Sequence, residues 1–218
     1  MNIIELVVKY KHYYLTGIAI TLLLSFLALI IGAVLGSLIS LLKISKNKFL
    51  GFLATAYIEV VRGIPMIVQI SLVFYGSDVL FGVDMSPFMA SLVAVSLNSA
   101  AYVAEIIRSG IQSIDTGQSE ASRSLGISER QTMRHIIFPQ AIKNILPALG
   151  NEFVTLIKET SVASTIGVAE LMFASKIVQS SSWQPFKPLI VVAVVYFIIT
   201  FTLSQLMRFF ERRLAHND

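Results

Sequence analysis

A long uncharged run near the start of the chain, from Leu15 to Leu42, constrains the fold more than any other feature. At about 1.5 Å per residue, a helix over this run crosses the roughly 30 Å hydrocarbon core of a bilayer with tilt to spare. The run is also longer than the apolar part of a signal peptide. Of the 218 residues, 55% are hydrophobic and only 14% are charged, which is too apolar for a soluble domain of this length. The sequence therefore predicts an all-α polytopic membrane protein.

Further apolar stretches bring the number of predicted transmembrane helices to five. The predicted spans cover residues 15–42, 52–80, 87–107, 142–166 and 188–210. We expect the second span to break at Gly63 and Pro65, because proline removes a helical hydrogen bond. We expect the fourth to be interrupted at Pro147, at Gly150 and at the polar group of residues 158–161. Residues 1–14 mix apolar and charged positions at helical spacing and predict an interfacial helix, so that residues 15–213 form the transmembrane domain.

Two features of the predicted bundle concern packing and orientation. Gly32 and Gly36 form a GxxxG pattern, which indicates either close helix contact or a tolerance of small residues. Lys43, Lys46 and Lys48 share one short loop, and such basic loops lie on the cytoplasmic side. Most of the 17 lysines and arginines fall on that side if the N-terminus lies outside and the C-terminus inside, so we predict this orientation.

The composition also excludes several classes of function. The chain has no cysteine, which excludes disulfides and thiolate sites, and its three dispersed histidines predict no metal site. It has no GxxxxGK[ST] phosphate loop and no GxS nucleophile elbow, so we expect neither ATP binding nor catalysis in this chain. The net charge of +4 favours lipid head groups over nucleic acid as the anionic partner.

Residues 115–139 form the one long polar segment between strongly apolar ones. Asp115 with Gln118, and Ser128 with Gln131, are each spaced as a capping box that begins a helix. Gly126 lies between them as a turn or C-cap. The segment therefore predicts two short helices, which we call the 115–139 hairpin, on the membrane surface. Four apolar residues at helical spacing predict a packing face for its first helix: Ile111, Ile114, Ala121 and Leu125.

The hairpin resembles the EAA motif of permease subunits in ATP-binding-cassette (ABC) importers. That motif reads E-A-A, three residues, G, nine residues, I, one residue, L-P. The matching positions here are Glu120, Ala121, Ser122, Gly126, Ile136, Phe138 and Pro139. The chain departs from the motif at Ser122, usually Ala, and at Phe138, usually Leu. The resemblance implies a type I ABC importer permease fold, in which the cytoplasmic loop 108–141 couples the bundle to an ATPase subunit.

The resemblance extends to most of the chain. The blocks at residues 57–69, 97–111 and 156–171 are similar to permeases of the polar amino-acid uptake subgroup, and the last block with the FERRL ending is most similar to glutamine permeases. This resemblance implies import of a polar amino acid, glutamine first, by alternating access across the bacterial cytoplasmic (inner) membrane. The implied partners are ATPase subunits that hold ATP and Mg²⁺, a second permease chain, with a homodimer favoured, and an extracytoplasmic substrate-binding protein.

Polar side chains within the predicted spans mark candidate positions along a substrate path, because each is costly in the bilayer unless it faces protein or water. The candidates are Arg62, Gln69, Asn98, Tyr102, Glu159, Thr160, Ser161 and Ser164. An amino acid needs donors for its carboxylate and an anion for its ammonium group, and Arg62 and Glu159 fit these two roles. The alternative is structural: Glu59 with Arg62, and Glu105 with Arg108, have the spacing of fixed ion pairs. Lys158 beside Glu159 is a third candidate pair.

Three other functions are compatible with a membrane bundle. A scaffold or regulatory subunit without a transport path would use the polar residues only as structural locks. A secondary transporter is disfavoured, because the sequence has no obvious inverted repeat. An intramembrane enzyme is disfavoured as well, because no nucleophile and base can be recognised.

Overall fold

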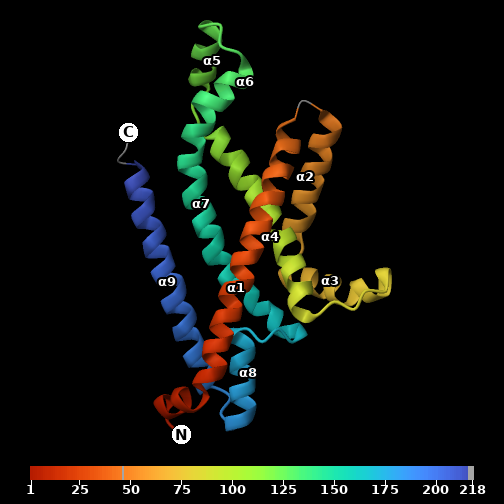
Figure 1. Ribbon diagram of the computed structural model, residues 1–218, viewed down its shortest axis with the longest axis vertical. Helices are drawn as coiled ribbons and strands as arrows, with labels where there is room; N and C mark the ends of the chain where they lie inside the picture. The colour runs from red at the N-terminus through yellow and green to blue at the C-terminus, as the bar shows by residue number, and fades with distance from the viewer. Residues whose placement is uncertain (46, 216–218) are drawn as a thin grey trace.

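The computed structural model describes residues 1–45 and 47–215, so Lys46 of the basic loop lies outside the described residues. No strand occurs in this part of the chain. The elements are α1 (Ile3–Ile44), α2 (Lys48–Gly63), α3 (Met66–Phe81), α4 (Pro87–Gln112), α5 (Thr116–Ser124), α6 (Glu129–Thr132), the π-helix η1 (Met133–Ile137), α7 (Phe138–Glu159), the 3₁₀ helix η2 (Thr160–Ile166), α8 (Leu171–Ser182) and α9 (Lys187–Ala215). Figure 1 shows an elongated bundle in which α1 and α4 lie centrally.

The first helix joins two predicted segments. Residue Asn2 caps it by accepting a hydrogen bond from the Glu5 N–H, and the helix continues for 42 residues. Tyr10 departs from helical geometry (φ −108°, ψ 15°), and the first turns point away from the axis of the rest of α1 (Figure 1). The N-terminal segment is therefore helical up to a kink at Tyr10, which separates it from the rest of α1, and its position at the membrane interface stays a prediction.

The predicted break in the second span is confirmed. Helix α2 ends at Gly63 and α3 begins at Met66, and their axes meet at 104°. Pro65 causes the break because it cannot donate a backbone hydrogen bond. It is followed immediately by α3, for which it is the N-cap residue.

The predicted interruptions at Pro147 and Gly150 are wrong, whereas the one at the polar group 158–161 is confirmed, because α7 gives way to the 3₁₀ helix η2 at Thr160. Helix α7 runs without interruption from Phe138 to Glu159, with Pro147 inside it. The chain changes direction further on, where η2 ends at Ile166, Gly167 follows with φ +95°, and α8 begins at an angle of 48°. Helix α8 was not predicted, because its sequence is too polar to be recognised as a span.

Hydropathy and length identify three helices of the described chain that are able to cross a membrane alone: α1, α4 and residues Lys187–Arg213 of α9. Two bent units pass the same test, α2 with α3 and Glu129–Ile166 with α8, which gives up to five spans. The prediction of an all-α polytopic membrane protein is confirmed, and the described helices are compatible with three to five spans.

The centre of the bundle is the seam between α1 and α4. Small side chains let the two backbones approach closely: a Cβ added at Gly32 would lie 2.6 Å from Ser99 Oγ, and one at Gly36 would lie 2.7 Å from the Ala100 carbonyl oxygen. Of the two interpretations of the GxxxG pattern, close helix contact is therefore correct. Both helices contribute buried alanines and serines along this seam.

Candidate functional site

The 115–139 hairpin stands beyond one end of the bundle, between the ends of α4 and α7 (Figure 1). Asp115 caps α5 by accepting a 2.6 Å hydrogen bond from the Gly117 N–H, and Ser128 with Gln131 forms the predicted capping box of α6. The predicted packing face is wrong, because α4 ends at Gln112 and α5 starts a new helix at Thr116. As a result Leu125 is 79% exposed instead of packed.

The EAA-like residues form the turn of the hairpin and its return to the bundle. Gly126 adopts φ +76°, a conformation that favours glycine. Ser122, where the motif usually has Ala, is buried, and its hydroxyl donates to the Gln118 carbonyl at 2.7 Å. Glu120 and Ala121 are exposed on α5. Ile136 is half-buried in η1, and Pro139 is exposed in the first turn of α7.

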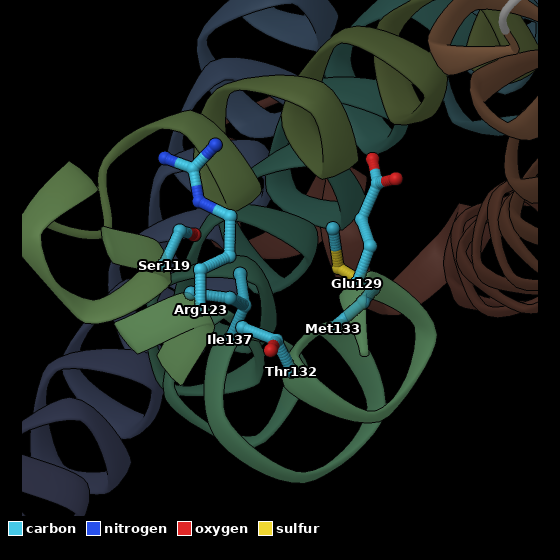
Figure 2. A pocket seen from close by; sticks show the side chains of 6 residues that line it. All are labelled: Ser119, Arg123, Glu129, Thr132, Met133 and Ile137. Atoms are coloured by element: carbon cyan, nitrogen blue, oxygen red, sulfur yellow. The ribbon is translucent and has the colours of Figure 1, made fainter. Parts of the chain in front are cut away.

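A pocket of about 360 Å³ opens between the two arms of the hairpin. Its lining residues come from α5, α6 and η1: Ser119, Arg123, Glu129, Thr132, Met133 and Ile137. Figure 2 shows Arg123 and Glu129 extending in the same direction from opposite walls, with Met133 between them. The pocket thus presents a cation and an anion around an apolar floor.

Four of the predicted pathway residues come together where α2, α3 and α4 meet. The Arg62 guanidinium carbon lies 5.1 Å from the centre of the Tyr102 ring, a cation–π contact. Gln69 donates to the Val61 and Ile64 carbonyls at 2.7 Å each. Asn98 donates to Gln69 Oε1 at 3.3 Å.

Of the three predicted ion pairs, one, Glu105 with Arg108, is in contact in the described part of the chain. Arg108 donates to Glu105, which also accepts from Lys43 of α1 at 3.1 Å. Glu59 is exposed and forms no ion pair with Arg62 within the described residues, because Arg62 turns instead to the ring of Tyr102. The prediction of a Glu59 pair is thereby corrected.

The other four pathway candidates lie at the junction of α7 and η2, which packs against α3 and α4. Thr160 is fully buried and faces Ser25 of α1, with the two hydroxyl oxygens 3.4 Å apart. Ser161 donates to the Lys158 carbonyl, and Ser164 accepts from Lys176 at 3.1 Å. Glu159, the last residue of α7, is half-buried. Within the described chain, no hydrogen bond joins these residues to Arg62, Gln69, Asn98 or Tyr102.

Two buried carboxyl groups were not predicted as site residues. Glu152 is 8% exposed and lies beside Ser99 of α4, two helical turns before Glu159. The apolar stretch around it, LPALGNEFVTLI, was the signal that could have identified it. Glu170 is fully buried and caps α8, accepting from the Met172 and Phe173 N–H groups at 2.9 and 2.7 Å and from the Tyr196 hydroxyl at 2.9 Å.

The intramembrane polar residues are connected to the hairpin through two helices. Among the described residues, no three His, Asp or Glu side chains are placed to hold a metal ion. The helices that carry the intramembrane polar groups, α4 with Asn98 and Tyr102 and α7 with Glu152 and Glu159, are the same two that hold the hairpin. A force on the hairpin therefore acts directly on both.

Comparisons with known proteins agree with this arrangement. Residues 28–216 match the family model of the binding-protein-dependent transport system inner membrane component. A relative from Rickettsia bellii, named as a glutamine transport system permease protein, GlnP, is 41% identical over 202 residues, covering 93% of each chain. The arginine transport system permease protein ArtQ of Bacillus subtilis is 39% identical over 206 residues, covering 94% of each.

A solved structure matches the whole fold. The crystal structure of an amino acid ABC transporter with histidines contains a chain that superposes with a TM-score of 0.94 at 46% identity, covering 98% of this chain and 99% of that one. The chain belongs to the binding-protein-dependent transport system inner membrane component family and is a permease subunit of a bacterial inner-membrane ABC importer for amino acids.

Proposed function

We propose that this permease moves a polar amino acid, with glutamine as first candidate, inward by alternating access driven by separate ATPase subunits. The observation that carries the mechanism is the placement of the 115–139 hairpin on the ends of α4 and α7 (Figure 1). When two ATPase subunits bind ATP with Mg²⁺, they close against each other. The hairpins that they hold then move together. The movement passes along α4 and α7 to the intramembrane polar residues.

The hairpin has the surface that such a partner requires. Glu120, Ala121 and Leu125 are exposed on α5 and its C-terminal turn. The adjoining pocket offers Arg123 and Glu129 around an apolar floor. We propose that Glu120, Ala121, Ser122, Gly126, Ile136 and Pro139 form the coupling contact with an ATPase subunit.

The proposed substrate path lies where α2, α3 and α4 meet and continues towards η2. Arg62 supplies a guanidinium for the substrate carboxylate, with Tyr102 beneath it. Glu159 supplies a carboxylate for the ammonium group, and Thr160, Ser161 and Ser164 supply hydroxyl groups nearby. Relatives named for glutamine and for arginine are similarly close to this chain, so the choice of amino acid is part of the proposal.

We propose that two copies of the chain pair, because few spans enclose a solute path alone.

We also propose that the N-terminus lies outside, since it is at the opposite end of the bundle from the hairpin (Figure 1). An extracytoplasmic binding protein delivers the substrate at that outer end. Because the chain has no native cysteine, single cysteines test the orientation. A membrane-impermeant maleimide added outside should label Asp84→Cys and spare Glu120→Cys, and the reverse result would contradict it.

The central experiment is uptake into proteoliposomes that contain the permease, its ATPase subunits and its binding protein. Radiolabelled glutamine and arginine are compared with ATP and with a non-hydrolysable analogue. We expect one amino acid to accumulate only with hydrolysable ATP. Equal accumulation with the analogue would contradict coupling to ATP. If ATPase subunits bind but no amino acid in a wider panel moves, the proposed path is wrong.

A further inference from the structure

The break between α2 and α3 leaves backbone carbonyl groups without their helical donors. In a continuous helix the N–H of residue 65 would donate to the Val61 carbonyl, but Pro65 has no N–H. The Ile64 N–H reaches the Val61 oxygen only at 3.4 Å. The Ile64 carbonyl also lacks its usual donor, because the Val68 N–H bonds instead to the Pro65 oxygen at 2.9 Å. Unsatisfied carbonyl groups inside a membrane protein are costly.

Gln69 replaces the missing donors. Its amide nitrogen carries two hydrogens, and it lies 2.7 Å from both the Val61 and the Ile64 oxygens. These two acceptors fix the orientation of the amide, so Oε1 faces the Asn98 Nδ2, which donates to it at 3.3 Å. Both donors and the carbonyl of Gln69 are therefore already engaged by this chain.

We propose that Gln69 is a positioning residue: it locks the α2–α3 angle onto α4 through Asn98, and it does not itself bind the transported amino acid. The lock acts next to Arg62, because Val61, whose carbonyl Gln69 holds, directly precedes Arg62. It thereby keeps the guanidinium over the Tyr102 ring. Asn98 is 4% exposed, and its Oδ1 has no hydrogen-bond partner in the described part of the chain. In the described part of the chain, the Asn98 amide oxygen is therefore still available to another partner, whereas the Gln69 amide is engaged.

Replacing Gln69 by Glu and by Ala separates this role from direct substrate binding. A carboxylate cannot donate to the two carbonyl groups, so Gln69→Glu should be as defective as Gln69→Ala. We expect about a tenfold or greater loss of ATP-driven glutamine or arginine uptake in both variants. The matched control is Ser71→Ala on the same helix, since the Ser71 hydroxyl, as far as the described residues go, bonds only to the Ile67 carbonyl of its own helix. If Gln69 bound the substrate ammonium group, Gln69→Glu would keep or increase uptake, and that result would overturn the proposal.

A second measurement tests the lock without any transport. The absence of native cysteine allows spin labels at Phe52→Cys on α2 and Val79→Cys on α3, both largely exposed positions. Double electron–electron resonance on the assembled transporter in nanodiscs, with labelled chain diluted by unlabelled chain, reports the α2–α3 distance. We expect one narrow distribution with Gln69 or with Ser71→Ala, and a broad one with Gln69→Ala or Gln69→Glu. Unchanged distributions in the Gln69 variants would overturn the lock.

Only the uptake measurement rests on the proposed function. The spin-label distances do not depend on transport. If no amino acid is taken up by the unaltered transporter, the proposed function fails while the spin-label distances still decide the lock. Restoring the backbone donor gives an independent check. In a Pro65→Ala background, Gln69→Ala should lower the melting temperature less than it does with Pro65 present. An equal decrease would show that Gln69 does not replace the proline's missing N–H.

Discussion

The α1–α4 seam is closely packed and buried, whereas the 115–139 hairpin is largely exposed, although α4 is part of the seam and leads directly into the hairpin. At the seam, Gly32 and Gly36 bring two backbones into contact, and the surrounding side chains are small and buried. In the hairpin, Glu120, Ala121 and Leu125 are exposed. The seam is held by packing within the chain, whereas the hairpin keeps its contact surface for a partner.

This difference shows how the protein can transmit force without deforming. Close packing at the seam makes α4 a rigid element, because such interiors leave little room for side chains to rearrange. The hairpin is held mainly by its own caps and turn. Substitutions in the two regions should therefore have opposite signatures: a loss of stability at the seam, and a loss of coupling with unchanged stability in the hairpin.

The largest effect on stability is expected from Gly36→Val. The new side chain would meet the Ala100 carbonyl and Val103 of α4 at less than 3 Å, so the two helices must separate. We expect a loss of about 3 kcal/mol in the free energy of unfolding, measured as a lower melting temperature in detergent. The control is Gly76→Ala on α3, where a Cβ has only an ordinary contact at 3.8 Å. Equal melting temperatures for the two variants would contradict the role of close packing at the seam in stabilising the bundle.

The next largest effect is expected at Glu170, which joins α8 and α9 to the same bundle. Glu170→Ala leaves the Met172 and Phe173 N–H groups and the Tyr196 hydroxyl without their acceptor in a buried place. We expect a loss of about 2 kcal/mol in the free energy of unfolding, again from melting in detergent. Tyr196→Phe removes only one of these bonds and should lose less. A Glu170→Ala variant as stable as the parent would show that the buried cap does not hold α8.

A smaller effect is expected where α1 and α4 end near the hairpin. Lys43 and Glu105 form an ion pair at 3.1 Å with side chains 17% and 24% exposed, and Glu105 also binds Arg108. Because Arg108 remains, Lys43→Gln should lose about 1 kcal/mol or less. The decrease in melting temperature should shrink in high salt. A loss of stability as large as that of Gly36→Val would indicate that the rigid part of α4 reaches its C-terminal end.

The sequence was most informative where local chemistry determines the structure. Pro65 predicts a break, and Ser128 with Gln131 predicts a helix start, because each signal acts within a few residues. The GxxxG pattern left two interpretations open, since its contact is made with a distant helix. Pro147 shows the limit of such signals. The same residue type lies inside the continuous helix α7, where contacts with other helices stabilise the helical backbone.

Partners from distant segments were not predictable from local pattern. Gln69 is a candidate substrate ligand in the sequence, but in the structure its amide is engaged by Val61, Ile64 and Asn98. Arg62 has Glu59 at ion-pair spacing, yet it lies over Tyr102, forty residues further along the chain. The contacts of Gln69 depend on the 104° bend between α2 and α3, and that of Arg62 on the packing of α2 against α4. No single-helix pattern specifies either.

The smallest effect on stability, and the clearest on transport, is expected in the hairpin. Glu120 is exposed on α5, so Glu120→Ala should change the free energy of unfolding by no more than about 0.5 kcal/mol. The same variant should lose ATP-driven uptake, because the proposed contact with the ATPase is broken while the bundle is intact. Asp84→Ala is the matched control, since it removes an exposed carboxylate beyond the opposite end of α4. Melting temperature, ATPase binding and uptake are measured on both variants. Full uptake by Glu120→Ala would contradict the coupling role of this residue, and a large loss of stability would contradict the independence of the hairpin from the bundle.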